Sequence, residues 1–198
     1  MKKNTIAIPA LLSQEAQNFP DPNLALLEPN GLLAIGGKLS SEQLIIAYQS
    51  GIFPWFNEND PILWWSPTPR ALLYPLNFKC SKSLKKTLKK DIKITCDLDF
   101  ESVINHCRKL RKDKEGTWIT PQMLTSYIEL HEQGIAHSIE VWKEDILIGG
   151  LYGISMGKAF FGESMFHLES NASKIALLAL CHLPITFDFI DCQLPSSH

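Results

Sequence analysis

Residues 51–70 constrain the possible folds more than any other stretch of this chain. They hold three of the five tryptophans, two phenylalanines and four prolines. Prolines fix φ and remove backbone donors, so we expect neither one continuous helix nor a central strand here, although the segment carries a large aromatic surface. Two interpretations stay open. The pattern alone favours a proline-braced plug between packed elements over the wall of a site for an apolar or ring-bearing ligand.

Length and composition limit the class of protein. A chain of 198 residues with 45% hydrophobic residues can bury one core, or one core and a small lobe. No apolar run approaches the length of a membrane span, and the start of the chain does not read as a secretory signal. The five cysteines are odd in number and never spaced Cys-x-x-Cys. The sequence therefore predicts reduced thiols, no metal site and a cytoplasmic location.

The first part of the chain is predicted to form a small lobe over residues 1–69. Residues 1–39 mix short apolar runs with prolines and glycine turns, which indicates loops and short strands. A helix is expected to begin after Ser40, whose hydroxyl can cap it, with Gln43 completing a capping box. The proline-rich style ends near Arg70, and we place the boundary of the lobe there.

Residues 70–198 have the pattern of an α+β domain. Capped helices with period 3.6 come first, and an antiparallel meander, one more helix and a last strand follow. Asn171 is expected to cap that last helix. Helices are expected at 81–90, 100–110, 121–133 and 172–183, a charged loop at 111–116, and strands at 71–74, 92–96, 138–143, 146–155, 158–165 and 187–192.

A cationic segment stands out from a nearly neutral chain. The formal net charge is −2, yet seven of the nineteen basic residues lie between positions 79 and 93, with Asp91 as the only acid among them. The helix expected there would turn Leu84 and Leu88 inward and cover the rest of its surface with lysines. Such a helix can be an ordinary solvated face. Its charge density also fits salt-sensitive, sequence-independent contacts to a nucleic acid backbone.

Acidic residues mark a second candidate site. Glu163 lies inside an apolar strand, where an unpaired carboxylate would be costly, so we expect it to need a cation. Asp191 and Gln193 follow at the end of a later strand, and strand alternation would turn both to one face. The arrangement can be a structural ion pair or an acidic pocket for an amine or a guanidinium.

The cysteine and histidine residues give no clear chemistry. Cys192 beside Asp191 allows a thiol nucleophile, but no histidine can be assigned as its base, so the sequence favours a buried inert thiol. His131, His137 and His182 lack the spacing of metal ligands, and we interpret them as packing or surface residues.

The order of the elements resembles the N-acetyltransferase-like architecture. That fold usually carries a glycine-rich turn for the coenzyme A pyrophosphate at the start of the helix after the meander. Residues 167–174 contain no glycine, so backbone amides could not easily hold a pyrophosphate there. If the chain is an acyltransferase, its donor is expected to differ from coenzyme A.

Eight motifs resemble the bacterial leucyl/phenylalanyl-tRNA–protein transferases, and they extend over nearly the whole chain. The motifs are Glu28-Pro29-Asn30-Gly31-Leu32-Leu33-Ala34, Gly51-Ile52-Phe53-Pro54-Trp55-Phe56, Trp64-Trp65-Ser66-Pro67, Gly116-Thr117-Trp118-Ile119-Thr120, His137-Ser138-Ile139-Glu140-Val141-Trp142, Gly162-Glu163-Ser164-Met165-Phe166, Asn171-Ala172-Ser173-Lys174 and Asp191-Cys192-Gln193.

This resemblance implies a fold and an activity. A small N-terminal domain would pack on a domain similar to the N-acetyltransferase fold, here residues 70–198. The enzyme would move leucine or phenylalanine, and less readily methionine, from aminoacyl-tRNA onto an N-terminal arginine or lysine of a protein, which marks that protein for degradation. The donor is an activated ester, so the reaction needs orientation and proton removal more than a covalent nucleophile. No cofactor and no membrane are expected, and a monomer is expected.

The resemblance also implies site residues. Glu163 would hold the cationic acceptor, Asp191 would act on the amine as proton acceptor or electrostatic anchor, and Gln193 would orient the reacting groups. Leu180 stands where a phenylalanine is expected, which affects the shape of the amino acid pocket. The binding residues implied are Trp55 and Trp118 for the aminoacyl-adenosine end, Leu151, Phe160, Leu177 and Leu180 for the pocket, and Lys82, Lys85, Lys86 and Lys89 for tRNA.

One departure from the family keeps an alternative open. Family members continue past the residue matching His198, so we expect a C-terminally truncated domain whose sheet edge would lie uncovered. The alternative is a tRNA- or RNA-binding protein whose catalysis is impaired by this truncation. A coenzyme A-dependent acyltransferase is a third class, disfavoured by the missing glycine turn.

Overall fold

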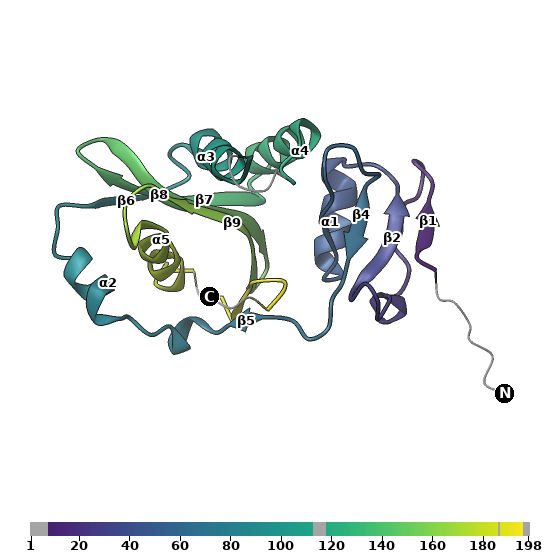
Figure 1. Ribbon diagram of the computed structural model, residues 1–198, viewed down its shortest axis with the longest axis horizontal. Coiled ribbons are helices and arrows are strands. Elements are labelled where there is room, and N and C mark those ends of the chain that lie inside the picture. Colours follow the sequence, from purple (N-terminus) through teal and green to yellow (C-terminus); the bar gives the residue numbers. More distant parts are fainter. Residues whose placement is uncertain (1–7, 113–117, 186, 196–198) are drawn as a thin grey trace. The chain divides into compact units, whose positions relative to one another are not determined.

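Two units make up the molecule, Met1–Pro69 and Arg70–His198. The computed structural model describes residues 8–112, 118–185 and 187–195 (Figure 1). Each unit has its own sheet. Among the helices of the described residues, none combines the length and the apolar character that a membrane span requires.

The first unit is built on a four-stranded sheet with the order β1-β2-β4-β3. β1 runs parallel to β2, whereas β4 is antiparallel to both of its neighbours. The elements are β1 (Ala10–Leu12), the short helix η1 (Pro22–Leu24), β2 (Leu32–Gly36), α1 (Ser41–Gln49), β3 (Phe53–Pro54) and β4 (Leu63–Trp65). The expected cap of α1 is present, because Ser40 Oγ accepts a hydrogen bond from the Gln43 N–H.

The aromatic segment forms part of this sheet, which corrects the expectation that it holds no central strand. β4 lies between β2 and β3. The prolines allow this because Pro61 and Pro67 fall on either side of β4 and neither lies within it. Trp64 is fully buried in β4, and its Nε1 donates to the Gly36 carbonyl oxygen at 2.9 Å. The buried part of the segment is therefore core of the first unit.

The second unit is built on a six-stranded sheet with the order β5-β10-β9-β8-β7-β6. Only the β9–β10 pair is parallel among the described pairs of this sheet. The predicted meander is present as β7, β8 and β9. The strands are β5 (Leu72–Leu73), β6 (Lys93–Cys96), β7 (Ala136–Lys143), β8 (Ile146–Met156), β9 (Ala159–His167) and β10 (Phe189–Asp191).

Helices cover both faces of this sheet (Figure 1). α3 and α4 lie on one face, and α5 lies on the other, with α2 at its side. The core on the α5 face joins Leu84 of α2 to Ile175 and Leu180 of α5 and to residues of the sheet. The helices are η2 (Pro75–Asn77), α2 (Lys82–Thr87), α3 (Phe100–Lys112), α4 (Pro121–Glu132) and α5 (Ala172–Cys181).

Several predicted boundaries are corrected. The lysine helix ends at Thr87, so Leu88 is 39% exposed and does not point inward as expected. α3 continues through Lys112, where a loop was expected, and the rest of the expected loop lies outside the described residues. The α4 cap is as predicted, because Thr120 Oγ1 accepts from the Met123 N–H.

Candidate active site

Glu163 lies at an irregularity of the sheet. Along the β8–β9 pair, Tyr152 is opposite Ser164 while Gly153 is opposite Gly162, so Glu163 is an extra residue of β9. Such bulges re-aim side chains and occur near active sites. Glu163 is 6% exposed, and its Oε2 accepts from the Tyr127 hydroxyl at 3.0 Å. The bulge therefore turns the carboxylate toward α4.

The three predicted catalytic residues meet at this bulge. Gln193 Nε2 donates to Glu163 Oε1 at 2.8 Å, and the Gln193 N–H donates to Asp191 Oδ1 at 2.7 Å. Both Glu163 oxygens thus accept hydrogen bonds from neutral donors, the Tyr127 hydroxyl and the Gln193 carboxamide. Two carboxylates and a carboxamide form one connected polar group.

The predicted alternation of Asp191 and Gln193 is wrong in its geometry. β10 ends at Asp191, and Gln193 has φ 64, in the left-handed region. The positive φ turns the chain so that the Gln193 carboxamide reaches β9. Asp191 and Gln193 still belong to the same polar group, but a turn after β10 brings them together and strand alternation does not.

Arg70 is a member of this group that sequence reasoning missed. Its Nε lies 2.9 Å from Asp191 Oδ1, and the two side chains are 16% and 5% exposed. A buried acid with a cationic partner is thus present, and that acid is Asp191. No local pattern indicates a partner 121 positions away. Tyr127 is likewise absent from the site residues predicted from sequence.

An apolar cavity of about 290 Å³ lies on the α5 side of the sheet. Of the four predicted pocket residues, Phe160 and Leu180 line it, whereas Leu151 and Leu177 belong to the apolar core of the same face. Gly153 lets the Phe160 ring lie close to β8, because a Cβ there would be 2.5 Å from a ring carbon. The lining residues are Cys96, Asp97, His137, Ser138, Ile139, Ser155, Phe160, Leu180, Leu183, Pro184, Ile185 and Phe187.

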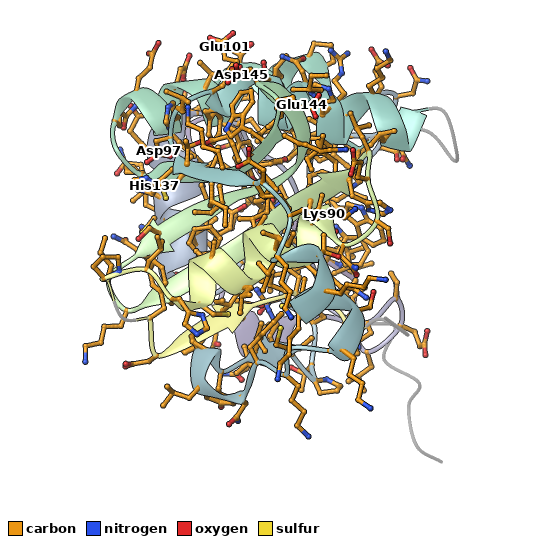
Figure 2. All side chains as sticks on the ribbon, turned by 90° about the vertical axis from the view of Figure 1, so that its left-hand side faces the viewer. Lys90, Asp97, Glu101, His137, Glu144 and Asp145 are labelled. Atoms are coloured by element: carbon orange, nitrogen blue, oxygen red, sulfur yellow. The ribbon has the colours of Figure 1, made fainter. Side chains whose placement is uncertain are left out.

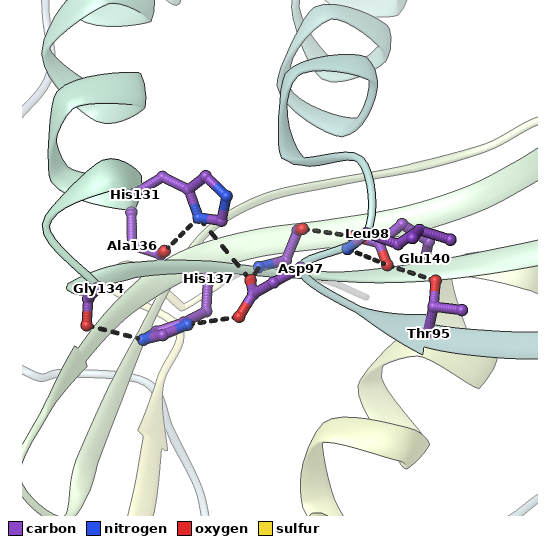
Figure 3. Close-up of polar contacts among 9 residues, drawn as sticks. Thr95, Asp97, Leu98, His131, Gly134, Ala136, His137 and Glu140 are labelled. Atoms are coloured by element: carbon purple, nitrogen blue, oxygen red, sulfur yellow. Dashed lines mark hydrogen bonds and ion pairs between the residues drawn. The ribbon is translucent and has the colours of Figure 1, made fainter.

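A charged pair forms part of the cavity lining (Figure 3). Asp97 and His137 lie next to each other, and Lys90, which follows the lysine helix, lies elsewhere on the molecule (Figure 2). His137 Nδ1 is 2.8 Å from Asp97 Oδ2, and its Nε2 is 3.1 Å from the Gly134 carbonyl oxygen. The hydrogen bond with Asp97 raises the pKa of His137. Burial opposes ionisation of Asp97, but its bonds to His137 and to the Ser138 N–H lower the pKa of Asp97. Both His137 nitrogens are engaged, which favours the imidazolium form.

Neither cysteine near these sites is an activated thiol. Burial, with Asp97 and Glu140 nearby, raises the pKa of Cys96 to about 11. Cys192 is exposed as a residue, which corrects the expectation that it is buried. Its sulfur is partly shielded, and this burial together with Asp191 raises the pKa of the thiol. Nucleophilic thiols need a lowered pKa, so the structure gives no support to thiol catalysis.

The lysine helix is anchored through an unexpected contact. Asn171 does not cap α5 through its side chain. Instead, its Nδ2 lies 3.0 Å from both Ser83 Oγ and Thr87 Oγ1 of α2. The four predicted tRNA-binding lysines are exposed, and within the described residues none has an acidic partner within 4 Å. They are Lys82, Lys85, Lys86 and Lys89.

The two predicted tryptophan contacts belong to different units. Trp55 in the first unit is 42% exposed, and its ring centroid lies 5.5 Å from that of Trp65. Trp65 Nε1 also donates to the Trp55 carbonyl oxygen at 2.7 Å. Trp118 in the second unit is half-buried just before the α4 cap. In the described part of the chain, no group of three or more His, Cys, Asp and Glu side chains could hold a metal ion.

Comparison with known proteins identifies the family. Residues 72–198 match the family model described as leucyl/phenylalanyl-tRNA protein transferase, and residues 37–68 match the model of its N-terminal domain. The chain belongs to the leucyl/phenylalanyl-tRNA–protein transferase family. It is therefore a member of a family of transferase enzymes, as its motifs predict, and the non-catalytic alternative is not favoured.

Curated relatives are similar over most of their length. A leucyl/phenylalanyl-tRNA–protein transferase of Cellvibrio japonicus is 55% identical over 190 residues, which cover 94% of this chain and 81% of the relative. One of Legionella pneumophila is 53% identical over 182 residues, covering 91% and 81%. A solved Bacteroides thetaiotaomicron protein of unknown function matches with TM-score 0.48, 11% identity and coverage of 63% and 49%, too low for a comparison of folds.

Proposed function

We propose that the protein transfers leucine or phenylalanine, and less readily methionine, from aminoacyl-tRNA to the N-terminal arginine or lysine of acceptor proteins, and so marks them for degradation. The observation that carries the proposal is the connected group of Glu163, Gln193 and Asp191 in a chain of this family. The relatives' names give the aminoacyl-tRNA and the protein as substrates of those relatives.

The reaction needs no redox partner. The acceptor α-amine attacks the carbonyl carbon of the aminoacyl ester, a C–N bond forms and the ester C–O bond breaks. The ribose oxygen of the tRNA leaves and gains the proton that the amine loses. An α-amine titrates near pH 8, so a large share is protonated at neutral pH and binding must favour the neutral amine. The site therefore works by orientation and electrostatics.

The polar group fits the acceptor side of this reaction. Glu163 receives the guanidinium or ammonium group of the acceptor's first residue, because it is a carboxylate that Tyr127 and Gln193 hold in place within the same polar group. Gln193 orients the reacting amine and ester. Asp191 serves as an electrostatic anchor, because its Oδ1 already accepts from Arg70 and from the Gln193 N–H.

The apolar cavity is assigned to the side chain of the donor's amino acid, so the ester carbonyl has to reach from the α5 face to the polar group on the α4 face. A volume of about 290 Å³ lined by Phe160, Leu180 and Phe187 suits an aliphatic or aromatic side chain. Leu151 and Leu177 form the apolar wall behind the lining. The lysines of α2, on the same side of the sheet, bind the tRNA backbone. Trp118 in the second unit and, separately, the exposed Trp55 in the first unit are each assigned as contacts for the aminoacyl-adenosine end.

The second unit is proposed to be an N-acetyltransferase-like aminoacyltransferase domain, with residues 1–69 as its N-terminal lobe. Support comes from the antiparallel meander, the bulge in β9 and the parallel β9–β10 pair that follows. The protein works as a cytoplasmic monomer without a cofactor.

Transfer of labelled leucine from Leu-tRNA to a peptide that begins with arginine tests the function. We expect transfer to arginine and lysine peptides and none to a peptide beginning with glutamate. Acetyl-coenzyme A serves as the control donor and is expected to give no product. Binding of Leu-tRNA without any transfer would reject the enzyme and leave a tRNA-binding protein.

A further inference from the structure

Arg70, at the start of the second unit, pairs with Asp191, the last residue of β10. Its Nε lies 2.9 Å from Asp191 Oδ1, and the exposed fractions of the two side chains are 16% and 5%. A buried ion pair is a poor choice for stability alone, because desolvation offsets most of the attraction. We therefore expect the Arg70–Asp191 pair to position other groups of the site in addition to any effect on stability.

The backbone around Gln193 is held from the same side. The Gln193 N–H donates to Asp191 Oδ1 at 2.7 Å, the oxygen that also receives Arg70. The Gln193 carbonyl accepts from the Ala71 N–H at 3.1 Å, and the Cys192 N–H donates to the Ala71 carbonyl oxygen at 2.8 Å. Both ends of the Gln193 residue are thus fixed by Asp191 and by the residue after Arg70.

This clamp holds Gln193 in a conformation that it would not adopt readily. A φ of 64 is disfavoured for a residue with a Cβ and persists only where surrounding contacts enforce it. In that conformation the carboxamide reaches Glu163 Oε1 at 2.8 Å. Strained residues of this kind gather at functional sites.

We propose that Arg70 is a positioning residue for aminoacyl transfer, which holds the Asp191 carboxylate so that Gln193 keeps its carboxamide against Glu163. The inference rests on the proposed function. Arg70 acts through Asp191 and does not touch the substrates. Without the guanidinium, the buried Asp191 carboxylate loses its cation and turns toward solvent, which releases the Gln193 N–H.

Two substitutions test this inference with the full-length protein. Arg70→Met is expected to lower kcat for transfer of leucine to an arginine peptide by about 10- to 100-fold, the value of one charge-assisted hydrogen bond. KM for Leu-tRNA and for the peptide is expected to stay within about threefold, because the binding groups remain. Arg70→Lys is expected to recover part of kcat, because it restores the charge without the planar fork.

A double-mutant cycle separates positioning from an independent effect. Asp191→Asn and Arg70→Met are expected to be non-additive, so that the double variant loses about as much as the worse single one. Lys158→Met is the matched control. It breaks an exposed ion pair of 3.7 Å with Asp188 at the start of the same β9–β10 pair, and kcat is expected to stay at the wild-type value.

The outcomes are distinguishable. Wild-type kcat in Arg70→Met, losses that multiply with those of Asp191→Asn, or a loss confined to KM would each overturn the positioning role. A wild-type protein that transfers no leucine would overturn the proposed function and this inference with it. If Arg70→Met does not fold, Arg70→Lys decides, with an expected several-fold loss of kcat at an unchanged unfolding midpoint, and wild-type kcat there would reject the inference.

Discussion

The two faces of the six-stranded sheet are organised by different physics. On the α4 face, hydrogen bonds of 2.7 to 3.0 Å connect Arg70, Asp191, Gln193, Glu163 and Tyr127. The α5 face has an apolar cavity of about 290 Å³ near the C-terminal end of α5, and an exposed lysine helix that contacts Asn171 at the N-terminal end of α5. Hydrogen bonds are directional, whereas apolar packing and screened charges depend on volume and distance. A small change to a side chain on the α4 face, the first face, is therefore expected to affect the rate of transfer. A change on the α5 face, the second face, is expected to affect donor binding or stability.

The sharpest test of the first face is Glu163→Gln. The change keeps the size of the side chain and removes the charge that the acceptor cation needs. We expect kcat/KM for an arginine peptide to fall by about 100-fold, since a hydrogen bond between charged groups is worth about 1.5–3 kcal/mol. Affinity for Leu-tRNA is expected to stay unchanged. Steady-state kinetics with each substrate varied in turn measure both quantities.

Glu101→Gln is the control for that substitution. Glu101 is an exposed carboxylate in the first turn of α3. Its loss is expected to leave both kinetic constants unaltered. If Glu163→Gln weakened Leu-tRNA binding as much as peptide use, the assignment of the two faces to acceptor and donor would be wrong.

The lysine helix tests the second face. Replacing Lys82, Lys85, Lys86 and Lys89 with alanine is expected to weaken tRNA binding by about 10- to 100-fold at low salt. The plot of log affinity against log salt is expected to become shallower by roughly 0.7–0.9 for each phosphate that the helix no longer neutralises. Filter binding at several salt concentrations gives both numbers. Replacing Lys158, which lies in the turn between β8 and β9, is the comparison at a surface lysine outside α2. An equal loss there would show that any surface lysine contributes as much as the lysines of the helix.

Packing on the second face is tested by Gly153→Ala. The added Cβ would lie 2.2 Å from the Phe161 carbonyl oxygen of β9 and 2.5 Å from a ring carbon of Phe160, so both the neighbouring strand and the ring must shift. We expect a loss of about 1–3 kcal/mol in the free energy of unfolding, with weaker use of Phe-tRNA than of Leu-tRNA. Gly157→Ala is the control, because nothing lies within 4 Å of its added Cβ, although its φ of +58 costs about 1 kcal/mol. Equal losses from urea unfolding would argue against the packing explanation.

What the sequence predicted well depended on local signals. Ser40 and Thr120 cap their helices as expected, because capping needs only residues within one turn. The meander is found for the same reason, since alternation and short turns carry it. Asn171 shows how such a signal fails. Its amide bonds two hydroxyls of α2 in place of the α5 backbone, and no local pattern reveals that competition.

What the sequence missed depended on long-range register. The structure brings Glu163, Asp191 and Gln193 together, but Arg70 reaches Asp191 only because β5 pairs with β10. The bulge at Glu163 and the positive φ of Gln193 leave no pattern in composition or periodicity. Trp64 entered the core as part of a central strand because its flanking prolines lie outside the strand. Strand register and side-chain contacts of this kind can be determined only from the folded structure.

The smallest expected effect comes from the charged pair at the cavity. The folded pKa of His137 is raised above its ordinary value of 6.5, so its contribution to stability is present below that value and is lost as pH rises through the folded pKa. The pKa of Asp97 is lowered from 3.8, so its contribution is lost only as pH falls through that lower value. The pair therefore stabilises the protein most between about pH 4 and pH 6.5. Both side chains are 35% exposed, so we expect about 0.5 kcal/mol.

His137→Gln tests this window. The difference in unfolding free energy between wild type and variant is expected to be larger at pH 5 than at pH 9, because the imidazolium that pairs with Asp97 is lost at the higher pH. His182→Gln is the matched change, since His182 Nδ1 contacts only the Leu178 carbonyl oxygen among the described hydrogen bonds, and its difference is expected to be the same at both pH values. Parallel pH curves for His137→Gln and wild type would show that the pair acts through packing alone. The donor face would then owe its stability to apolar contacts, and the contrast between the two faces would become sharper.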